Sequence, residues 1–362
     1  MSRAVHRMLS PLLILVTLTS GIACHANEPT LSASSYVLIH ADSGRVLLAR
    51  NETDELPIAS TTKIMTALVA LRHSRLTDSV TVKREHLKEG SSMYLAEGET
   101  LTMEALLYGL MLPSGNDAAE CIADNCGGRE RFVRLMNETA AELGMTHTSF
   151  ANPSGLDETG HYSCALDMAR LMAAAMDEPA FLRIVSTRTA SVETRVMTNH
   201  NKLLSAVKEC NGGKTGYTGA AGRTLVTCAE RDAMRLIAVT LHDGNDWADH
   251  TALYDYGFSG CRMERAIERG KPCALSAVRG GETACVPLIP DRGFSYPLTD
   301  GETLALRYEL PEAVQAPVKA GQRLGEAVVY VDGKEVGRVA LRAANDMKAA
   351  EIKSPRLFLW RR

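Results

Sequence analysis

Two short apolar runs stand out near the start of the chain. Tyr36–His40 and Arg45–Ala49 lie on either side of Asp42-Ser43-Gly44. Apolar runs that flank a glycine-containing turn are typical of a β-hairpin. We therefore expect two antiparallel strands over residues 36–49.

Helical periodicity begins shortly after Pro57. Ile64, Leu68 and Leu71 recur at the spacing of one helix face. This pattern predicts a helix, and it places Ser60 close to the N-terminus of that helix.

The stretch from residue 103 to residue 175 is mostly helical in its pattern. Helices are predicted over Ala105–Leu112 and Arg131–Leu143. Ser163 is followed at the right distance by the acidic Asp167, which predicts that Ser163 caps the start of a further helix.

The pattern returns to strands after Lys208. Strands are predicted around Lys214, over Thr224–Ala229 and over Leu236–Leu241. Helices enclosed between an early hairpin and a late antiparallel set indicate one α/β (α+β) domain, which we assign to residues 27–260. We expect its sheet to be closed by both ends of the domain.

Short β-like runs alternate with proline and glycine beyond residue 260. Leu304–Tyr308 and Val328–Val331 are two of these runs, and Asp332-Gly333 marks a hairpin. We predict a small all-β domain over residues 261–342, from about Arg262 to Leu341, followed by a tail over residues 343–362.

Composition agrees with two folded domains. The chain has 362 residues, 45% of them hydrophobic, and a formal net charge of -3. This length is large for one domain, and the hydrophobic content is sufficient for a core. The charge predicts no broad basic surface, which argues against nucleic acid as a partner.

The N-terminus has the pattern of a secretion signal. Arg3 and Arg7 precede the apolar run Leu12–Val16, and small residues lead to Ala23-Cys24-His25-Ala26. We expect residues 1–26 to be a signal peptide cleaved after Ala26, so that the protein is exported to the cell envelope. An uncleaved membrane anchor and a lipid-modified Cys24 are the alternatives.

Eight of the nine cysteines follow this signal. An even number of cysteines in an exported chain suggests disulfides, and Cys210 and Cys228 are a candidate pair across a hairpin. No Cys-x-x-Cys pair occurs and the histidines do not cluster with the thiols, so no metal site is expected.

Three short motifs carry the candidate chemistry. They are Ser60-Thr61-Thr62-Lys63, Ser114-Gly115-Asn116 and Lys214-Thr215-Gly216, in this order. Each motif alone fits an ordinary helix start, loop or strand end. Together they supply the nucleophile, base, proton relay and anion-binding groups of a serine acyl-transfer enzyme whose base is a lysine.

The first motif pairs a nucleophile with its base. Residues three apart on a helix share a face, so Lys63 can reach the hydroxyl of Ser60. Lysine accepts a proton only when its pKa falls, which burial and a nearby cation both bring about. Lys214 is the candidate cation.

The other two motifs are predicted to handle protons and substrate. Ser114, in a tight turn between helices, can pass a proton to a leaving amine, and the Asn116 amide can hydrogen-bond substrate and hold Lys63. Lys214-Thr215-Gly216 lies on a predicted edge strand, where an extended peptide can pair and its carboxylate can be bound. The N–H groups of Ser60 and Tyr217 are candidates for an oxyanion hole.

These motifs and their contexts resemble one family. The stretches Pro57–Thr66, Met111–Ala119, Asn152–Leu156 and Gly213–Thr218 are similar to those of D-alanyl-D-alanine carboxypeptidases among the low-molecular-mass penicillin-binding proteins. The resemblance runs from about Ser34 to Leu341. It implies a penicillin-binding/β-lactamase-like transpeptidase domain followed by a β-rich domain.

The resemblance also implies a reaction. Ser60 would form an acyl-enzyme with Lys63 as its base, and D-alanine would be removed from peptidoglycan stem peptides ending in D-Ala-D-Ala. β-Lactams would acylate Ser60 as substrate mimics, and no metal or cofactor is expected. Catalytic roles fall on Ser60, Lys63, Ser114 and Asn116, and substrate-binding roles on Lys214, Thr215, Gly216, Tyr217 and His250.

His250 is included among the substrate-binding candidates because the chain departs from the family pattern at one place. Some members place a carboxylate-binding arginine after the strand that follows the third motif. The corresponding stretch Asp243–His250 has no arginine. His250 is therefore a candidate for this role, with an ordinary surface histidine as the alternative.

Other functions fit the same motif order. A class A-type β-lactamase needs a loop glutamate, and Glu158 in residues 150–161 lacks the expected Glu-x-x-x-Asn setting. A D,D-endopeptidase and a non-catalytic penicillin-sensing protein are further alternatives. The tail segment Pro355–Arg362 has the apolar run Leu357–Trp360 before two arginines, and either a weak membrane-surface contact or a disordered or packed tail fits it.

Overall fold

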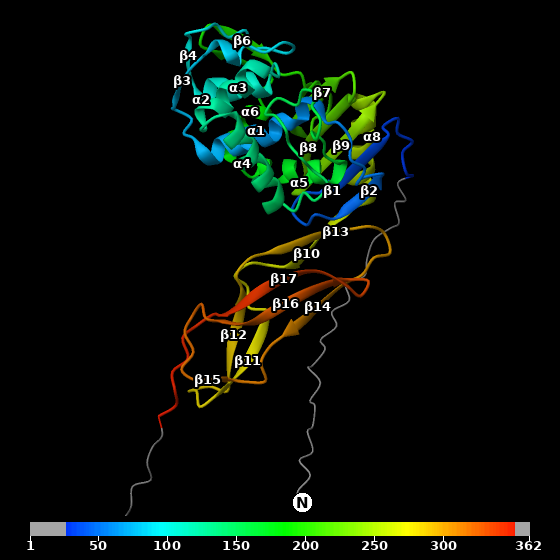
Figure 1. Cartoon of the computed structure of the whole chain (residues 1–362). Coiled ribbons are helices and arrows are strands. Elements are labelled where there is room, and N and C mark those ends of the chain that lie inside the picture. Colours follow the sequence, from blue (N-terminus) through cyan, green and yellow to red (C-terminus); the bar gives the residue numbers. More distant parts are fainter. Residues whose placement is uncertain (1–26, 352–362) are drawn as a thin grey trace, which may run out of the picture. The chain divides into compact units, whose positions relative to one another are not determined.

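The computed structural model describes residues 27–351, which separate into two compact units after Gly260 (Figure 1). The predicted signal peptide and the segment Pro355–Arg362 lie outside the described residues. No helix within residues 27–351 is long and apolar enough to cross a membrane.

A five-stranded antiparallel sheet forms the centre of the first unit, in the order β2-β1-β9-β8-β7. The predicted early hairpin and the late strands are both present, and β1 pairs with β9, so the two ends of the unit meet in one sheet. The strands are β1 (Ser35–His40), β2 (Val46–Arg50), β7 (Cys210–Thr218), β8 (Gly222–Arg231) and β9 (Met234–Asp243).

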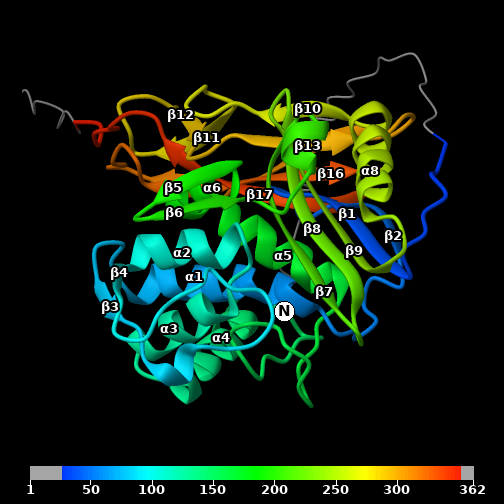
Figure 2. The same ribbon diagram turned by 90° about the horizontal axis from the view of Figure 1, so that it is seen from above.

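Helices cover both faces of this sheet (Figure 2). Val37 and Ile39 point into the large helical core, whereas Leu38, between them, lies against Gly257 of α8 on the other face. The helices are η1 (Ala59–Thr62), α1 (Lys63–His73), η2 (Arg84–His86), α2 (Met103–Met111), α3 (Asn116–Asn125), α4 (Arg129–Glu142), α5 (Ala165–Met176), α6 (Pro179–Val185), α7 (Leu203–Ala206) and α8 (Asp246–Gly260).

Two small hairpin-like pairs complete the first unit. They are β3 (Ser79–Thr81) with β4 (Thr100–Thr102), and β5 (Thr189–Val192) with β6 (Arg195–Thr198). The guanidinium of Arg195 donates to the carbonyls of Met93 and Tyr94 at 2.9 Å each, so β6 is tied to the loop that precedes β4.

One predicted helix start is wrong by one residue. The N-cap of α5 is Cys164, which has no side-chain cap, and not Ser163. The Ser163 hydroxyl instead lies 2.7 Å from the hydroxyl of Thr148. Asp167 accepts from Thr148 Oγ1 at 2.9 Å and binds Arg170 at 2.7 Å, so its spacing reflects a tertiary contact.

The second unit is all β, as predicted. A six-stranded sheet has the order β14-β16-β17-β12-β11-β15, and β10 pairs with β13. Asp332 and Gly333 both have positive φ and connect β16 to β17, which confirms the predicted hairpin. The strands are β10 (Arg262–Ile267), β11 (Ala274–Arg279), β12 (Cys285–Pro290), β13 (Phe294–Leu298), β14 (Leu304–Glu309), β15 (Val314–Gln315), β16 (Arg323–Val331) and β17 (Lys334–Ala343).

The chain remains part of this unit beyond residue 342, where the sequence pattern places the start of a tail. Met347 is buried in the core, and its backbone exchanges hydrogen bonds of 2.8 and 2.9 Å with Val318. Ala350 N donates to Gly280 O at 2.8 Å. These pairings are too distant in sequence for the local pattern to reveal.

The cysteines of the described residues are all free, so the candidate Cys210–Cys228 disulfide is absent. Cys210 packs with Leu225 on one face of the sheet, whereas Cys228 belongs to the helical core with Val226. Neighbouring strand residues alternate between faces, and the two thiols therefore point apart.

Candidate active site

Ser60 lies in the 3₁₀ turn η1, directly before α1. The turn is held by its own hydroxyls, since Thr61 Oγ1 donates to Ile58 O at 2.6 Å and Thr62 Oγ1 to Ala59 O at 2.8 Å. Gly155 packs against it so closely that a Cβ there would lie 1.9 Å from Ala59 O. The serine is therefore presented by a rigid helix start.

Lys63 is completely buried beneath Ser60. Its Nζ contacts three oxygens, Ser60 Oγ at 2.8 Å, Asn116 Oδ1 at 2.8 Å and Ser154 O at 2.6 Å. Burial, followed by the nearby charge of Lys214, lowers the pKa of Lys63 well below its ordinary value. The amine is thus oriented toward the serine hydroxyl and favoured in its neutral form.

The second motif forms the loop between α2 and α3. Ser114 has a left-handed backbone, with φ 67°, and its buried Oγ has no hydrogen-bond partner among the described residues. Asn116 begins α3 and is fixed from both ends of its amide, because Nδ2 donates to Glu89 O at 2.8 Å while Oδ1 accepts from Lys63.

The third motif lies on β7, which is an edge strand of the sheet as predicted. Lys214 is buried and its Nζ donates to Thr215 O at 2.9 Å, and burial lowers the pKa of Lys214 to about 7. A Cβ on Gly216 would lie 2.4 Å from Thr224 Oγ1 and 3.0 Å from Ser60 N. Only glycine therefore lets this strand approach the nucleophile so closely.

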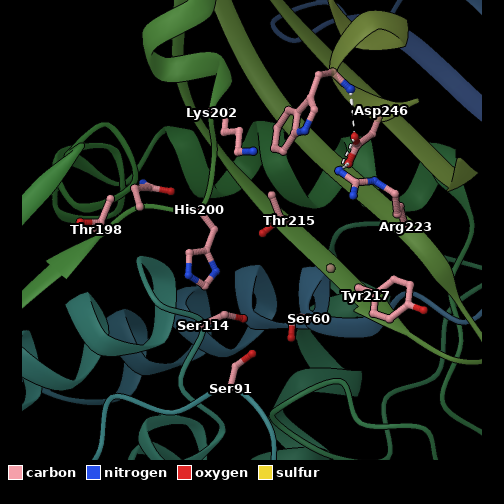
Figure 3. A pocket seen from close by; sticks show the side chains of 13 residues that line it. Ser60, Ser91, Ser114, Thr198, His200, Lys202, Thr215, Tyr217, Arg223 and Asp246 are labelled. Atoms are coloured by element: carbon pink, nitrogen blue, oxygen red, sulfur yellow. Dashed lines mark hydrogen bonds and ion pairs between the residues drawn. The ribbon is translucent and has the colours of Figure 1, made fainter. Parts of the chain in front are cut away.

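These motifs open into one pocket of about 650 Å³ (Figure 3). Ser60 and Ser114 line it, together with Thr215, Gly216 and Tyr217 of β7. Lys63 and Lys214 are buried and do not line the pocket, and the charge of Lys214 acts on Lys63. The structure thus brings together the predicted residues of all three motifs.

His250 is not part of the pocket, and the expectation that it faces substrate is wrong. Its side chain is fully buried under the sheet, with Nδ1 2.7 Å from Thr227 Oγ1 and Nε2 3.1 Å from Thr240 Oγ1. Burial lowers the pKa of His250 to about 3. Asp246 and Trp247, about one helical turn earlier in α8, line the pocket instead.

The cation at that end of the pocket is Arg223 of β8. It lies opposite Tyr217 in the β7–β8 register, and its guanidinium donates to both carboxylate oxygens of Asp246, at 2.7 and 3.0 Å (Figure 3). The guanidinium carbon also lies 5.8 Å from the centre of the Trp247 ring. The sequence pattern did not indicate this arginine, because Arg223 lies on β8 itself, whereas the family pattern pointed to Asp243–His250, after β9.

The opposite wall of the pocket was also missed. It comes from the end of β6 and the residues after it, including Thr198, Asn199, His200 and Lys202. The signal in the sequence was the polar string Thr198–Lys202, placed between two strand-forming segments.

Glu158 lies elsewhere. Its carboxylate accepts from Arg129 at 3.1 Å and from Asn152 Nδ2 at 3.0 Å, and it does not line the pocket that holds Ser60. In residues 27–351 there is no cluster of histidine, cysteine, aspartate or glutamate residues that could hold a metal ion.

Comparisons with known proteins agree on one class of enzyme. A family model described as D-alanyl-D-alanine carboxypeptidase matches residues 22–245, and one for the C-terminal domain of penicillin-binding protein 5 matches residues 262–349. The chain is 33% identical to D-alanyl-D-alanine carboxypeptidase DacF of Bacillus subtilis, over 95% of both chains. It is 32% identical to D-alanyl-D-alanine carboxypeptidase DacD of Escherichia coli, over 90% of each.

A solved structure is similar over both units. The crystal structure of penicillin-binding protein 5 from Haemophilus influenzae matches with a TM-score of 0.78 and 30% identity, covering 90% of this chain and 100% of that one. The similarity therefore extends from the pocket-bearing unit into the all-β unit.

Proposed function

We propose that this chain, which belongs to the D-alanyl-D-alanine carboxypeptidase family of peptidases, removes the terminal D-alanine from peptidoglycan stem peptides. The reaction proceeds through an acyl-enzyme on Ser60. The observation that carries this proposal is the buried Lys63 amine, 2.8 Å from the Ser60 hydroxyl and depressed in pKa. A neutral amine at this distance is a base that can activate serine.

The first step is attack on the penultimate D-alanine. As Ser60 Oγ bonds to the carbonyl carbon, its proton passes to Lys63 Nζ. The oxygen of that carbonyl becomes negative and is stabilised by the N–H groups of Ser60 and Tyr217, which we assign as the oxyanion hole. The close approach of Gly216 to Ser60 N supports this assignment.

The second step releases D-alanine. The C–N bond breaks, and the leaving nitrogen takes a proton from the Ser114 hydroxyl, which regains one from Lys63. Water then hydrolyses the ester on Ser60. The unpartnered Oγ of Ser114, held beside this centre by a left-handed backbone, supports the relay role.

Substrate binding follows from the edge position of β7. An extended peptide can add to this strand through backbone hydrogen bonds, with the Asn116 amide on its other side. Thr215 and Arg223 are the groups we assign to its terminal carboxylate, with Lys214 contributing positive charge. Arg223 thereby takes the role first considered for His250.

We infer a location outside the cytoplasm, in the cell envelope, where peptidoglycan is found. The secretion pattern of residues 1–26 and the family membership support export. Covalent binding of β-lactams to Ser60 and a role in cell-wall remodelling and cell shape are part of the same proposal.

Mass spectrometry after penicillin treatment tests this function. We expect one covalent adduct on Ser60 that is absent in Ser60→Ala. Lys63→Ala should slow acylation by about 10³-fold or more, because Lys63 is the base that hydrogen-bonds the Ser60 hydroxyl among the described residues. Lys88→Ala, at an exposed lysine, is the matched control and should label at the normal rate.

Three outcomes would contradict the proposal. Labelling at another residue would show that Ser60 is not the nucleophile. Normal labelling of Lys63→Ala would show that Lys63 is not the base. Rapid turnover of the adduct would indicate a β-lactamase instead. Product analysis with monomeric and crosslinked muropeptides separates carboxypeptidase from endopeptidase activity.

A further inference from the structure

His161 is a buried histidine that contacts the turn η1, and both of its ring nitrogens have partners. Its Nδ1 accepts from Ala151 N at 3.1 Å, and its Nε2 lies 2.8 Å from Thr62 Oγ1. A backbone N–H can only donate, so Nδ1 carries no hydrogen and the neutral ring carries its hydrogen on Nε2. His161 therefore donates a hydrogen bond to the hydroxyl of Thr62.

The hydroxyl of Thr62 passes this interaction on to the backbone. Thr62 is completely buried, and its Oγ1 donates to Ala59 O at 2.8 Å. A hydroxyl accepts and donates at the same time, so it satisfies both His161 and Ala59. The result is a chain of hydrogen bonds that runs from the imidazole to the carbonyl directly before Ser60.

The Ala59 carbonyl belongs to the same peptide unit as the N–H of Ser60. A trans peptide is planar, and its C=O and N–H point in opposite directions. Holding Ala59 O toward Thr62 therefore directs the Ser60 N–H away from Thr62. Gly216 of β7 approaches this nitrogen closely, since a Cβ on Gly216 would lie 3.0 Å from it, and Ser60 lines the pocket (Figure 3).

The backbone of this turn needs such support. Ala59 has φ 47°, in the left-handed region that is unfavourable for a residue with a Cβ. A residue in this conformation persists when the surrounding structure holds it there. The bond from Thr62 is one of the contacts that hold Ala59, and the close approach of Gly155 to Ala59 O is another.

The imidazole is neutral, as this arrangement requires. Burial lowers the pKa of His161 to about 4, against the opposing charges of Glu158 and Asp157, and the charge of Lys63 adds to the lowering. The ring also packs edge to face with Phe150, with ring centres 5.8 Å apart. At neutral pH the ring therefore keeps one N–H, on Nε2, and one acceptor nitrogen.

We propose that His161 is a positioning residue for the oxyanion hole. Through Thr62 it holds the Ala59–Ser60 peptide, so that the Ser60 N–H faces the oxygen that becomes negative during acylation. Neither His161 nor Thr62 lines the pocket, so both act through the turn and not on the substrate, and no proton is transferred along the chain. This inference rests on the proposed acyl-transfer function.

Two pairs of variants separate the hydrogen bond from mere occupancy of the site. In His161→Gln the side-chain amide is long enough to donate to Thr62, whereas in His161→Asn the shorter amide reaches only Ala151 N. Thr62→Ser keeps the hydroxyl, whereas Thr62→Val replaces it with a methyl group of similar size. His147→Asn, at a histidine that pairs with Glu55 outside the pocket, is the control.

The first measurement is the rate of acylation by penicillin in the full chain, separated from its non-covalent dissociation constant. His161→Asn and Thr62→Val should acylate at least about 10-fold more slowly, because an oxyanion-hole donor acts on the transition state, with the dissociation constant within about 2-fold of wild type. His161→Gln and Thr62→Ser should stay within about 3-fold of the wild-type rate. The double variant His161→Asn/Thr62→Val should be no slower than the slower single variant, because both changes break one chain.

The second measurement reads the oxyanion hole directly. Penicillin labelled with ¹³C at the β-lactam carbonyl gives an ester on Ser60 whose C=O stretch is visible by infrared difference spectroscopy. Hydrogen bonds from the oxyanion hole weaken this C=O bond, so their loss moves the stretch to higher wavenumber. We expect this shift in His161→Asn and Thr62→Val, and the wild-type position in His161→Gln, Thr62→Ser and His147→Asn.

Equal acylation rates in His161→Asn and His161→Gln would overturn the inference, and so would an unchanged C=O stretch in His161→Asn. Thermal unfolding midpoints show whether each variant is folded, and Thr62→Val gives the same test if His161→Asn does not fold. If wild type labels Ser60 and releases D-alanine while the two His161 variants behave alike, only the role of His161 fails. If wild type does neither, the proposed function fails first.

Discussion

The two units of this chain treat polar side chains in opposite ways. The first unit buries Lys63, Lys214 and His250, whereas Ser276 is the one buried polar residue among those described in the all-β unit. Burying a charge or an unpaired polar group is unfavourable. At the active site, burial of the two lysines lowers their pKa values, as the proposed reaction needs.

The all-β unit keeps its charges in water. Arg338 is exposed and binds Glu309, Glu326 and Glu335 at 2.8, 3.1 and 2.6 Å. Its core consists of apolar side chains such as Val286, Leu288 and Leu341. Such a unit is organised for stability, and we expect changes in it to leave acylation unaffected.

The largest difference in stability is expected between two glycines with nearly the same backbone. Gly155 has φ +85° and a Cβ there would lie 1.9 Å from Ala59 O, whereas Gly333 has φ +81° and open space around it. Gly155→Ala should destabilise by about 3 kcal/mol or more, through strain and displacement of the turn that carries Ser60. Gly333→Ala should cost about 1 kcal/mol, from the backbone alone.

Denaturant unfolding and penicillin labelling measure both effects. Gly155→Ala should also label at least about 10-fold more slowly, since a small misplacement of a nucleophile has a large effect on rate. Gly333→Ala should label normally. Equal losses of stability and labelling in the two variants would contradict the comparison.

The second expected effect is a loss of stability in acid that is larger in the first unit. Burial lowers the pKa of His161 to about 4 and that of His250 to about 3. In the unfolded chain these side chains take up protons below about pH 6.5, while in the folded protein they stay neutral. Stability should therefore fall as the pH drops from 6.5 toward 4, by about 2 kcal/mol per histidine at pH 5.

Calorimetry from pH 7 to pH 4.5 tests this, because residues 261–362 contain no histidine. The transition that abolishes penicillin labelling should move to lower temperature. His250→Gln should flatten this dependence on pH, and His73→Gln, at an exposed histidine, should not. If His250→Gln loses as much stability in acid as wild type and His73→Gln do, burial of His250 is not a cause of the loss.

The contrast between the units also explains what the sequence could predict. The early hairpin, the edge strand with Lys214 and the Asp332-Gly333 turn were predictable, because short-range periodicity and turn chemistry determine them. Each of the three motifs alone also fits an ordinary helix start, loop or strand end. Only their occurrence together in one chain predicted a shared site.

The missed residues depend on long-range geometry. Arg223 enters the pocket through its register opposite Tyr217, and Asp246 reaches it from the start of α8. His250 was misplaced for the same reason, since one further helical turn carries it under the sheet. Neither a strand register nor the depth of a helix turn can be read from local spacing.

The smallest expected change in stability separates backbone strain from function. Ser114, with φ 67°, and Ala233, with φ 63°, have the same left-handed backbone, one in the pocket and one in the exposed β8–β9 turn. Glycine adopts this conformation without strain, so each Ser114→Gly and Ala233→Gly change should stabilise by up to about 1 kcal/mol. Ser114→Gly also removes a buried hydroxyl without a partner, but it should lower D-alanine release by about 10²-fold because the proton relay is lost. Ala233→Gly should leave the rate of D-alanine release unchanged. A Ser114→Gly variant that is both stabilised and fully active would show that the strained backbone at Ser114 has no role in catalysis.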